Sequence, residues 1–192
     1  MPPFHGKAII FSAPSGAGKT TLVHYLLAIN PNLLFSISAT TRSPRADELH
    51  ERDYYFFTPD QFRQKLEKQA FIEWEEVYPD RYYGTLQSEI ERIWAQQKNV
   101  IFDVDVKGGV NLKNYFGNQA LAIFVRPPSL SKLRERLLTR NTDSPQSIQH
   151  RLDKAEYELE FENFFDITVI NDDLDEAKQR VQQLYQAFTS SS

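Results

Sequence analysis

The sequence predicts an α/β protein: a mostly parallel sheet with helices on both faces, interrupted by a small mixed α+β insertion. Three observations support this expectation. Short apolar segments alternate with segments of helical period near both ends of the chain. A stretch of small residues, FSAPSGAGKTTL at positions 11–22, joins the first apolar segment to the first helical one. From Thr40 to about Thr85 the residues become charged, polar and aromatic, which indicates a unit with its own small sheet.

Length and composition limit the class of protein. The 192 residues suit one compact domain, and the apolar share of 41% and charged share of 25% are typical of globular chains. A net charge of −4 disfavours general nucleic-acid binding, and the lack of cysteine excludes disulfides, thiolate metal sites and a cysteine nucleophile. The chain starts without a secretory h-region and has no apolar run of membrane-spanning length. We therefore expect a cytoplasmic protein that binds neither nucleic acid nor membranes; its oligomeric state stays open.

The first half of the chain contains the small residues, the insertion and two clear helix signals. Leu22, Leu26 and Ile29 have helical spacing, and Thr58 followed by Pro59 is typical of a capped helix start. The expected elements are a strand at 7–13, a helix at 19–29, a strand at 33–38, a short strand at 53–57, a helix at 58–69 and a hairpin at 70–85.

The second half returns to alternating strands and helices. Its clearest strand is NVIFDVD, an apolar run that ends in acidic residues. The expected elements are helices at 86–97, 129–140, 144–165 and 174–188, strands at 99–105, 120–128 and 166–172, and no regular structure at 189–192.

The small residues between the first strand and the first helix predict a phosphate-binding loop, formed by Gly16, Ala17, Gly18, Lys19 and Thr20. Such residues let backbone N–H groups converge at a helix N-terminus, where the partial charge is positive. The lysine reaches the outer phosphates, and the threonine hydroxyl can ligate Mg²⁺. The strict pattern begins with glycine, and Ala13 stands there. The alternative is a glycine-rich turn with an exposed lysine, but motif and context together favour a nucleoside triphosphate.

A phosphate loop needs an acidic partner for its metal, at the end of a neighbouring buried strand. The segment VIFDVD offers Asp103 and Asp105. Taken alone, either residue could simply end the strand. Next to a phosphate loop, we expect one of them to support the metal.

The polar insertion should hold a second substrate. Arg42 and Arg45 lie three residues apart, and Tyr54 and Tyr83 offer phenolic donors, so the four together would bind a monophosphate. Spacing alone leaves equally open that these are two solvated arginines and two tyrosines of a small core.

Glu73 lies between apolar and aromatic neighbours in the predicted hairpin. A buried carboxylate there needs donors, and guanine offers two adjacent ones, N1–H and the N2 amine, which adenine lacks. The alternative, equally open from this segment, is an edge-strand acid that faces water.

Read together, these segments resemble the guanylate kinase family. The matching segments occur in the family's order over nearly the whole chain: SAPSGAGKTTL, FSISATTRSPR, DYYFF, FIEWEEV, YYGT, VIFDVDVKG, RERLLTR, SIQHRL and VINDDL. The resemblance implies transfer of the γ-phosphoryl group of ATP to GMP, giving ADP and GDP, with Mg²⁺ as cofactor. It also implies a P-loop NTPase-type core at 1–36 and 87–192, a GMP-binding insertion at 37–86 and a short helical lid at about 137–152.

The resemblance assigns roles to individual residues. For ATP these are Ala13, Pro14, Ser15, Gly16, Ala17, Gly18, Lys19, Thr20, Thr21 and Asn171, with Thr20 on Mg²⁺ and Asp103 supporting the metal through water. For GMP they are Ser38, Glu73, Thr85 and Asp103 at the base and Arg42, Arg45, Tyr54 and Tyr83 at the phosphate. The side chains implied to act on the transferring group are Lys19, Arg42, Arg136, Arg140 and Arg151.

Three positions depart from the family pattern, and two alternatives compete with it. Asp47 and Glu51 stand where the family usually has glycine, as does Asn141 in the lid, which affects local loop shape rather than chemistry. The alternatives are a non-catalytic guanylate-kinase-like interaction module and a related kinase of another phosphorylated acceptor. The first has little reason to keep Lys19, the lid arginines and the strand-end acid together, and the second has no need of Ser38, Glu73 and the YYGT hairpin together.

Overall fold

The computed structural model describes residues 6–139 and 145–190, and it forms two sheets with helices around them. The strands are β1 (Ala8–Ser12), β2 (Leu33–Phe35), β3 (Ala39–Thr40), β4 (Tyr55–Phe56), β5 (Phe71–Tyr78), β6 (Arg81–Leu86), β7 (Asn99–Asp103), β8 (Ala120–Arg126) and β9 (Ile167–Ile170). The helices are α1 (Lys19–Ile29), α2 (Pro59–Glu67), α3 (Gln87–Ala95), α4 (Val106–Phe116), α5 (Leu130–Thr139), α6 (Pro145–Leu159) and α7 (Leu174–Ser190), with 3₁₀ turns η1 (Gly117–Gln119) and η2 (Glu160–Phe164).

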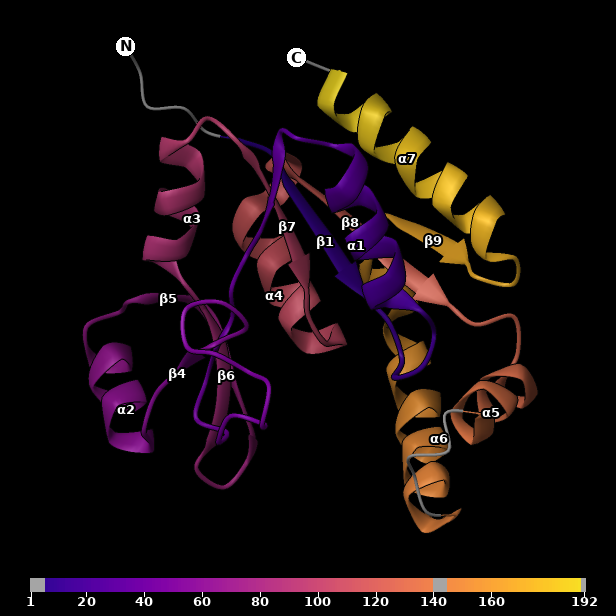
Figure 1. Cartoon of the computed structure of the whole chain (residues 1–192), viewed down its shortest axis with the longest axis horizontal. Helices are drawn as coiled ribbons and strands as arrows, with labels where there is room; N and C mark the ends of the chain where they lie inside the picture. The colour runs from indigo at the N-terminus through magenta and orange to yellow at the C-terminus, as the bar shows by residue number, and fades with distance from the viewer. Residues whose placement is uncertain (1–5, 140–144, 191–192) are drawn as a thin grey trace.

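The larger sheet has five parallel strands in the order β2-β7-β1-β8-β9. Its central strand β1 is buried along its whole length, because helices cover both faces of the sheet. Helices α1 and α7 cover one face of the sheet, and α3 and α4 cover the other (Figure 1). Ile9, Phe11 and Ile101 pack in the core on the first face, whereas Ile10 and Phe102 pack in the core on the second. The predicted fold class is confirmed.

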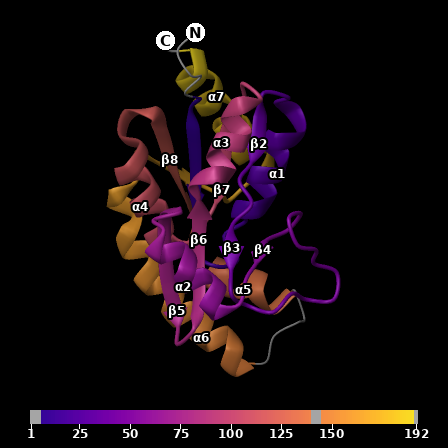
Figure 2. The same ribbon diagram turned by 90° about the vertical axis from the view of Figure 1, so that its left-hand side faces the viewer.

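The second sheet has four strands in the order β4-β3-β6-β5, in mixed directions. Helix α2 packs on this sheet (Figure 2). It contributes Phe62, whose ring stacks on Phe71 at 4.3 Å and on Tyr82 at 5.1 Å. The helix starts at the predicted cap: Thr58 and Gln61 form a capping box in which each side chain accepts from the other's backbone N–H. Figure 1 shows this sheet at the lower left and α5 with α6 at the lower right.

Several elements differ from the sequence expectation. Helix α4 was not predicted, because two glycines interrupt its pattern; Gly109 is required by close packing, since a Cβ there would lie 2.3 Å from Ser12 Oγ. Strand β3 was also missed, being two residues long. The expected helix at 144–165 ends at Leu159 and continues as η2, and α7 extends to Ser190 rather than stopping before 189. Within the described ranges, no helix combines the length and apolarity needed to cross a bilayer.

Candidate active site

The loop between β1 and α1 has the backbone of an anion site. Gly16 and Gly18 have φ of 95° and 94°, a region that favours glycine, and Gly18 is the N-cap of α1. A Cβ at Gly18 would also lie 2.2 Å from Asn171 Nδ2. No side chain caps this helix start, so its first N–H groups are available to a phosphate.

Lys19, Thr20 and Asp103 meet at the start of α1. Lys19 Nζ lies 2.7 Å from Asp103 Oδ1 and also donates to the carbonyl of Val104. The Thr20 hydroxyl donates to Asp103 Oδ2 at 2.7 Å. A hydroxyl and a carboxylate are hard oxygen donors of the kind that Mg²⁺ takes together with phosphate oxygens and water, so this set fits a divalent metal.

Asp105 has a different role from Asp103. Its side chain caps α4 by accepting from the Gly108 N–H at 2.8 Å, and its backbone carbonyl accepts from Ser12 Oγ at 2.9 Å. The structure therefore brings Asp103, and not Asp105, against Thr20.

A cavity of about 330 Å³ surrounds the phosphate loop. The cavity is lined by Ala13, Pro14, Ser15, Gly16, Gly18, Lys19, Thr20, Thr21, Asp103, Asp105, Lys154 and Glu158. Arg151 of α6 approaches the loop, with its Nη1 3.4 Å from Ser15 Oγ. Two of these residues, Lys154 and Glu158, were missed by the sequence reasoning, although they share a helix face with Arg151.

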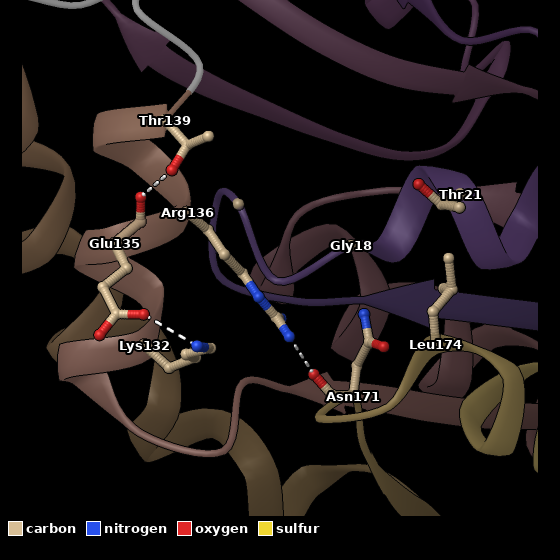
Figure 3. Close-up of a pocket in the computed structure, with 9 residues that line it drawn as sticks. Gly18, Thr21, Lys132, Glu135, Arg136, Thr139, Asn171 and Leu174 are labelled. Atoms are coloured by element: carbon tan, nitrogen blue, oxygen red, sulfur yellow. Dashed lines mark hydrogen bonds and ion pairs between the residues drawn. The ribbon is translucent and has the colours of Figure 1, made fainter.

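A second cavity, of about 450 Å³, lies beside Gly18, between α5 and the segment that follows β9 (Figure 3). Arg136 extends from α5 across it and donates to the carbonyl of Asn171 at 2.8 Å (Figure 3). The Asn171 amide donates to the carbonyl of Ala17 at 2.7 Å, while its Oδ1 is buried and has no partner among the described residues. The sequence predicted no role for the other side chains of this wall, which are Lys132, Glu135, Thr139 and Leu174. The available signal was the spacing of the first three, which places them on one helix face.

A third cavity, of about 340 Å³, lies between the two sheets. It is lined by Lys19, Ser38, Tyr54, Glu73, Glu75, Val77, Tyr83, Gly84, Asp103, Val104, Asp105, Gly108 and Lys154.

Glu73 is buried in this third cavity. It is 9% exposed, and its Oε1 accepts from the Thr85 hydroxyl at 2.7 Å. Burial raises the pKa of Glu73 to about 7, with Asp105 and Glu75 adding to the rise and Thr85 opposing it. The alternative of an edge-strand acid that faces water is wrong, although β5 is indeed an edge strand.

Arg42 is held in place by a residue that the sequence reasoning missed. Both of its terminal nitrogens donate to the Glu48 carboxylate at 2.8 Å, and its guanidinium lies 5.2 Å from the centre of the Tyr54 ring. The hydrogen bonds between these two side chains raise the pKa of Arg42 and lower the pKa of Glu48 to about 2. Arg45 differs: its backbone N–H donates to Glu48, and its side chain is exposed. Arg42 is thus not a solvated arginine.

Tyr54 and Tyr83 come together from different strands. Their rings pack edge to face with centres 6.3 Å apart. Desolvation raises the pKa of Tyr54, so its phenol stays protonated and can donate. Ser38 lies beside them at the start of the second sheet and lines the same cavity.

The departures from the family pattern fall in two places. Glu51 has φ of 65°, a conformation that costs a non-glycine residue energy, and Asp47 accepts from Arg52 through its backbone carbonyl. Arg140 and Asn141 lie outside the described residues.

Comparisons with known proteins agree with this geometry. The family model described as Guanylate kinase matches residues 5–188. The guanylate kinase of Bacteroides fragilis is 52% identical over 182 residues, 95% of this chain and 89% of that protein. That of Porphyromonas gingivalis is 51% identical over 183 residues, 95% of this chain and 97% of that protein. The crystal structure of guanylate kinase from Anaplasma phagocytophilum superposes with a TM-score of 0.75 at 24% identity, covering 98% of this chain and 89% of that one, and it shows the fold.

Proposed function

The chain belongs to the guanylate kinase family, and from this premise we propose which of its residues transfer the γ-phosphoryl group of ATP to GMP. The observation that carries the assignment is that two cavities meet at Lys19 and Asp103, which line both the phosphate-loop cavity and the cavity of Glu73. Donor and acceptor can therefore face each other across one lysine. In this proposal residues 1–36 and 87–192 form the core with a lid at about 137–152, and residues 37–86 form the GMP-binding insertion.

ATP binds with its phosphates on the loop and its adenine beside Asn171. Backbone N–H groups of Ala13 and of residues 15–21, with the ammonium of Lys19, hold the phosphates, and Pro14, which has no N–H, lines the same cavity. The unpartnered Oδ1 of Asn171 is an acceptor that suits the N6 amine of adenine, whereas guanine presents a carbonyl oxygen at that position.

Thr20 would hold Mg²⁺, and Asp103 would support it through water. The hydroxyl and the carboxylate already lie 2.7 Å apart at the loop. When bound, the metal offsets the negative charge of the phosphate oxygens.

GMP binds with its base at Glu73 and its phosphate at the arginines. The carboxylate of Glu73 accepts from guanine N1–H and the N2 amine, and Ser38, Thr85 and Asp103 complete the base site. The phosphate is held by Arg42, Arg45, Tyr54 and Tyr83. The pKa of Glu73, about 7, means that much of this carboxyl is neutral before guanine supplies its donors.

The chemical step needs alignment and charge stabilisation more than acid–base help. A GMP phosphate oxygen bonds to the γ-phosphorus of ATP as the bond to the bridging oxygen of ADP breaks. Along that path we assign charge stabilisation to Lys19 and Arg42, to Arg136 of α5 and Arg151 of α6, and to Arg140, whose role the family resemblance implies. These cations offset the repulsion between two polyanions. Closure of the insertion and the lid over both substrates excludes water, which would otherwise hydrolyse ATP in this cytoplasmic reaction.

The test is ADP production from ATP and Mg²⁺ with GMP, AMP, CMP or UMP as acceptor. Activity with GMP alone is the expected result. Equal activity with AMP would contradict the role of Glu73. Nucleotide binding without transfer to any acceptor would instead indicate an interaction module or a different phosphorylated acceptor.

A further inference from the structure

Helix α6 presents polar side chains to the phosphate loop from one face. Arg151, Lys154 and Glu158 are spaced three and four residues apart, so they lie one above the other on the helix. Arg151 approaches the Ser15 hydroxyl. Burial raises the pKa of the Glu158 carboxyl, and the nearby backbone N–H of Ser15 opposes that rise, so Glu158 also faces the loop. This face of α6 is therefore fixed against the loop at both ends, with Lys154 between them.

Lys154 has an unusual position relative to the two substrate cavities. It lines both the phosphate-loop cavity and the cavity of Glu73. Within the described residues, Lys19 and Lys154 are the two cationic side chains that line both. Lys19 is already engaged by Asp103 and by the Val104 carbonyl. A second cation thus lies where the donor and acceptor phosphates must meet.

Glu158 supplies the counter-charge that keeps Lys154 there. It is 4% exposed, its Oε1 lies 3.5 Å from Lys154 Nζ, and its Oε2 has no hydrogen-bond partner in the described part of the chain. Charge-assisted bonds are normally about 2.7–2.9 Å long, so this pairing is loose. The Lys154 side chain is 48% exposed. The ammonium is attracted toward the loop yet can still move to a phosphate.

We propose that Lys154 contacts the phosphoryl group as it passes from ATP to GMP, and that Glu158 is the residue that positions Lys154. The inference rests on the proposed function. The step itself is unchanged: the γ-phosphorus gains a bond to the GMP phosphate oxygen and loses its bond to ADP. Lys154 stays protonated throughout and transfers no proton. It stabilises charge that accumulates only when both substrates are bound.

The first test is steady-state kinetics of Lys154→Gln and Lys154→Arg. Losing one charge-assisted contact in the transition state should lower kcat about 10- to 100-fold. The KM values for ATP and GMP should change less than about threefold. Lys154→Arg should restore most of kcat, because the charge returns. The matched control is Lys178→Gln on α7, whose lysine pairs with Asp175 on its own helix at 2.9 Å and should leave activity unchanged.

The second test measures binding of a dinucleotide that joins adenosine to guanosine through a pentaphosphate. Lys154→Gln should weaken this probe about tenfold or more, while ADP alone and GMP alone bind nearly as before. Glu158→Gln, which keeps an acceptor for Ser15 but loses the charge, should give a smaller loss of kcat at unchanged thermal stability.

The outcomes separate the inference from the proposed function. A normal kcat for Lys154→Gln, in an enzyme that phosphorylates GMP, overturns the role of Lys154 and leaves the function standing. An equal loss in Lys154→Arg, or a fall in thermal stability that matches the fall in kcat, overturns it in favour of a structural role. A wild-type protein that does not phosphorylate GMP overturns the function itself.

Discussion

The proposed donor site and the proposed acceptor site are built in different ways. The donor site comes mainly from one continuous segment, residues 13–21, at the end of a fully buried strand, with Asp103 added by the neighbouring strand. The proposed acceptor site gathers Ser38, Tyr54 and Glu73, which line one cavity, and Arg42, which packs on the Tyr54 ring, from separate strands and loops of the small sheet. A local backbone geometry suffices for the first, whereas the second exists only once four strands pair.

The electrostatics of the two sites differ as well. At the donor site a cation and an acid lie 2.7 Å apart. Within residues 37–86 two glutamates have opposite environments: Glu48 pairs with Arg42 and has a pKa of about 2, whereas Glu73 forms no ion pair among the described residues and, being buried, has a pKa of about 7. The first is a structural partner of the phosphate site. The buried carboxylate of Glu73 needs hydrogen-bond donors, which a guanine base can supply.

The largest effect is expected at the donor site. Lys19→Ala removes one of the two lysines that line both cavities, the one in the phosphate loop, and should lower kcat on the order of 10³-fold, as loss of a preorganised charge-stabilising group does. Thermal unfolding should show that the fold persists, and Lys178→Ala serves as the control. Near-normal turnover would exclude the phosphate-loop assignment.

At the acceptor site, Glu73→Gln should act on one substrate only. Glutamine offers a single carbonyl oxygen where the carboxylate offers two, so kcat/KM for GMP should fall on the order of 10²-fold. The KM for ATP should stay within about twofold. Competition kinetics with AMP and GMP provide the measurement; an undiminished preference for guanine would show that another group reads the base.

A pH dependence follows from the raised pKa of Glu73, about 7. Guanine needs the ionised form, so the KM for GMP should rise about tenfold from pH 8 to pH 6. The same measurement on Glu73→Gln should show only the part of the pH dependence of KM that comes from titration of the GMP phosphate. The part that comes from Glu73 should be absent.

Raising the pH should strengthen GMP binding but lower the contribution of Glu73 to folding stability. The unfolded state releases the proton of Glu73 first, so its contribution to the free energy of unfolding falls as pH rises from 4.5 toward 7. Denaturant titrations of wild type and Glu73→Gln across that range check the sign. A pH dependence that Glu73→Gln leaves intact would assign it to other groups.

The smallest expected effect is on folding stability, and it allows the insertion, which contains α2, to be compared with the core, which contains α3. Gln69 after α2 and Gln97 after α3 have φ of 53° and 56°, which favour glycine at the end of a helix. Gln69→Gly and Gln97→Gly should each stabilise by about 0.5–1 kcal/mol without changing kcat.

Hydrogen exchange shows whether the two regions unfold together. If they do, both variants should slow exchange equally in α2 and α3. If the insertion opens by itself, Gln69→Gly should protect α2 alone. Equal protection would mean that the small sheet is no independent unit, and would restrict the proposed closure to a rigid-body motion.

By itself the sequence determined the fold class, nearly all the strands and helices, and the donor loop, because apolar periodicity and a contiguous glycine motif are local signals. Those signals failed where long-range packing decides the outcome. Helix α4 contains glycines that weaken its sequence pattern, but Gly109 is there because a larger residue would collide with Ser12. Other features were decided only by the tertiary structure. It places Asp103 rather than Asp105 against Thr20, and it buries Glu73 next to Thr85. It also pairs Arg42 with Glu48 and brings Lys154 to both cavities. The physical reason is that burial and charge pairing depend on what other segments bring, and no spacing within one segment records it.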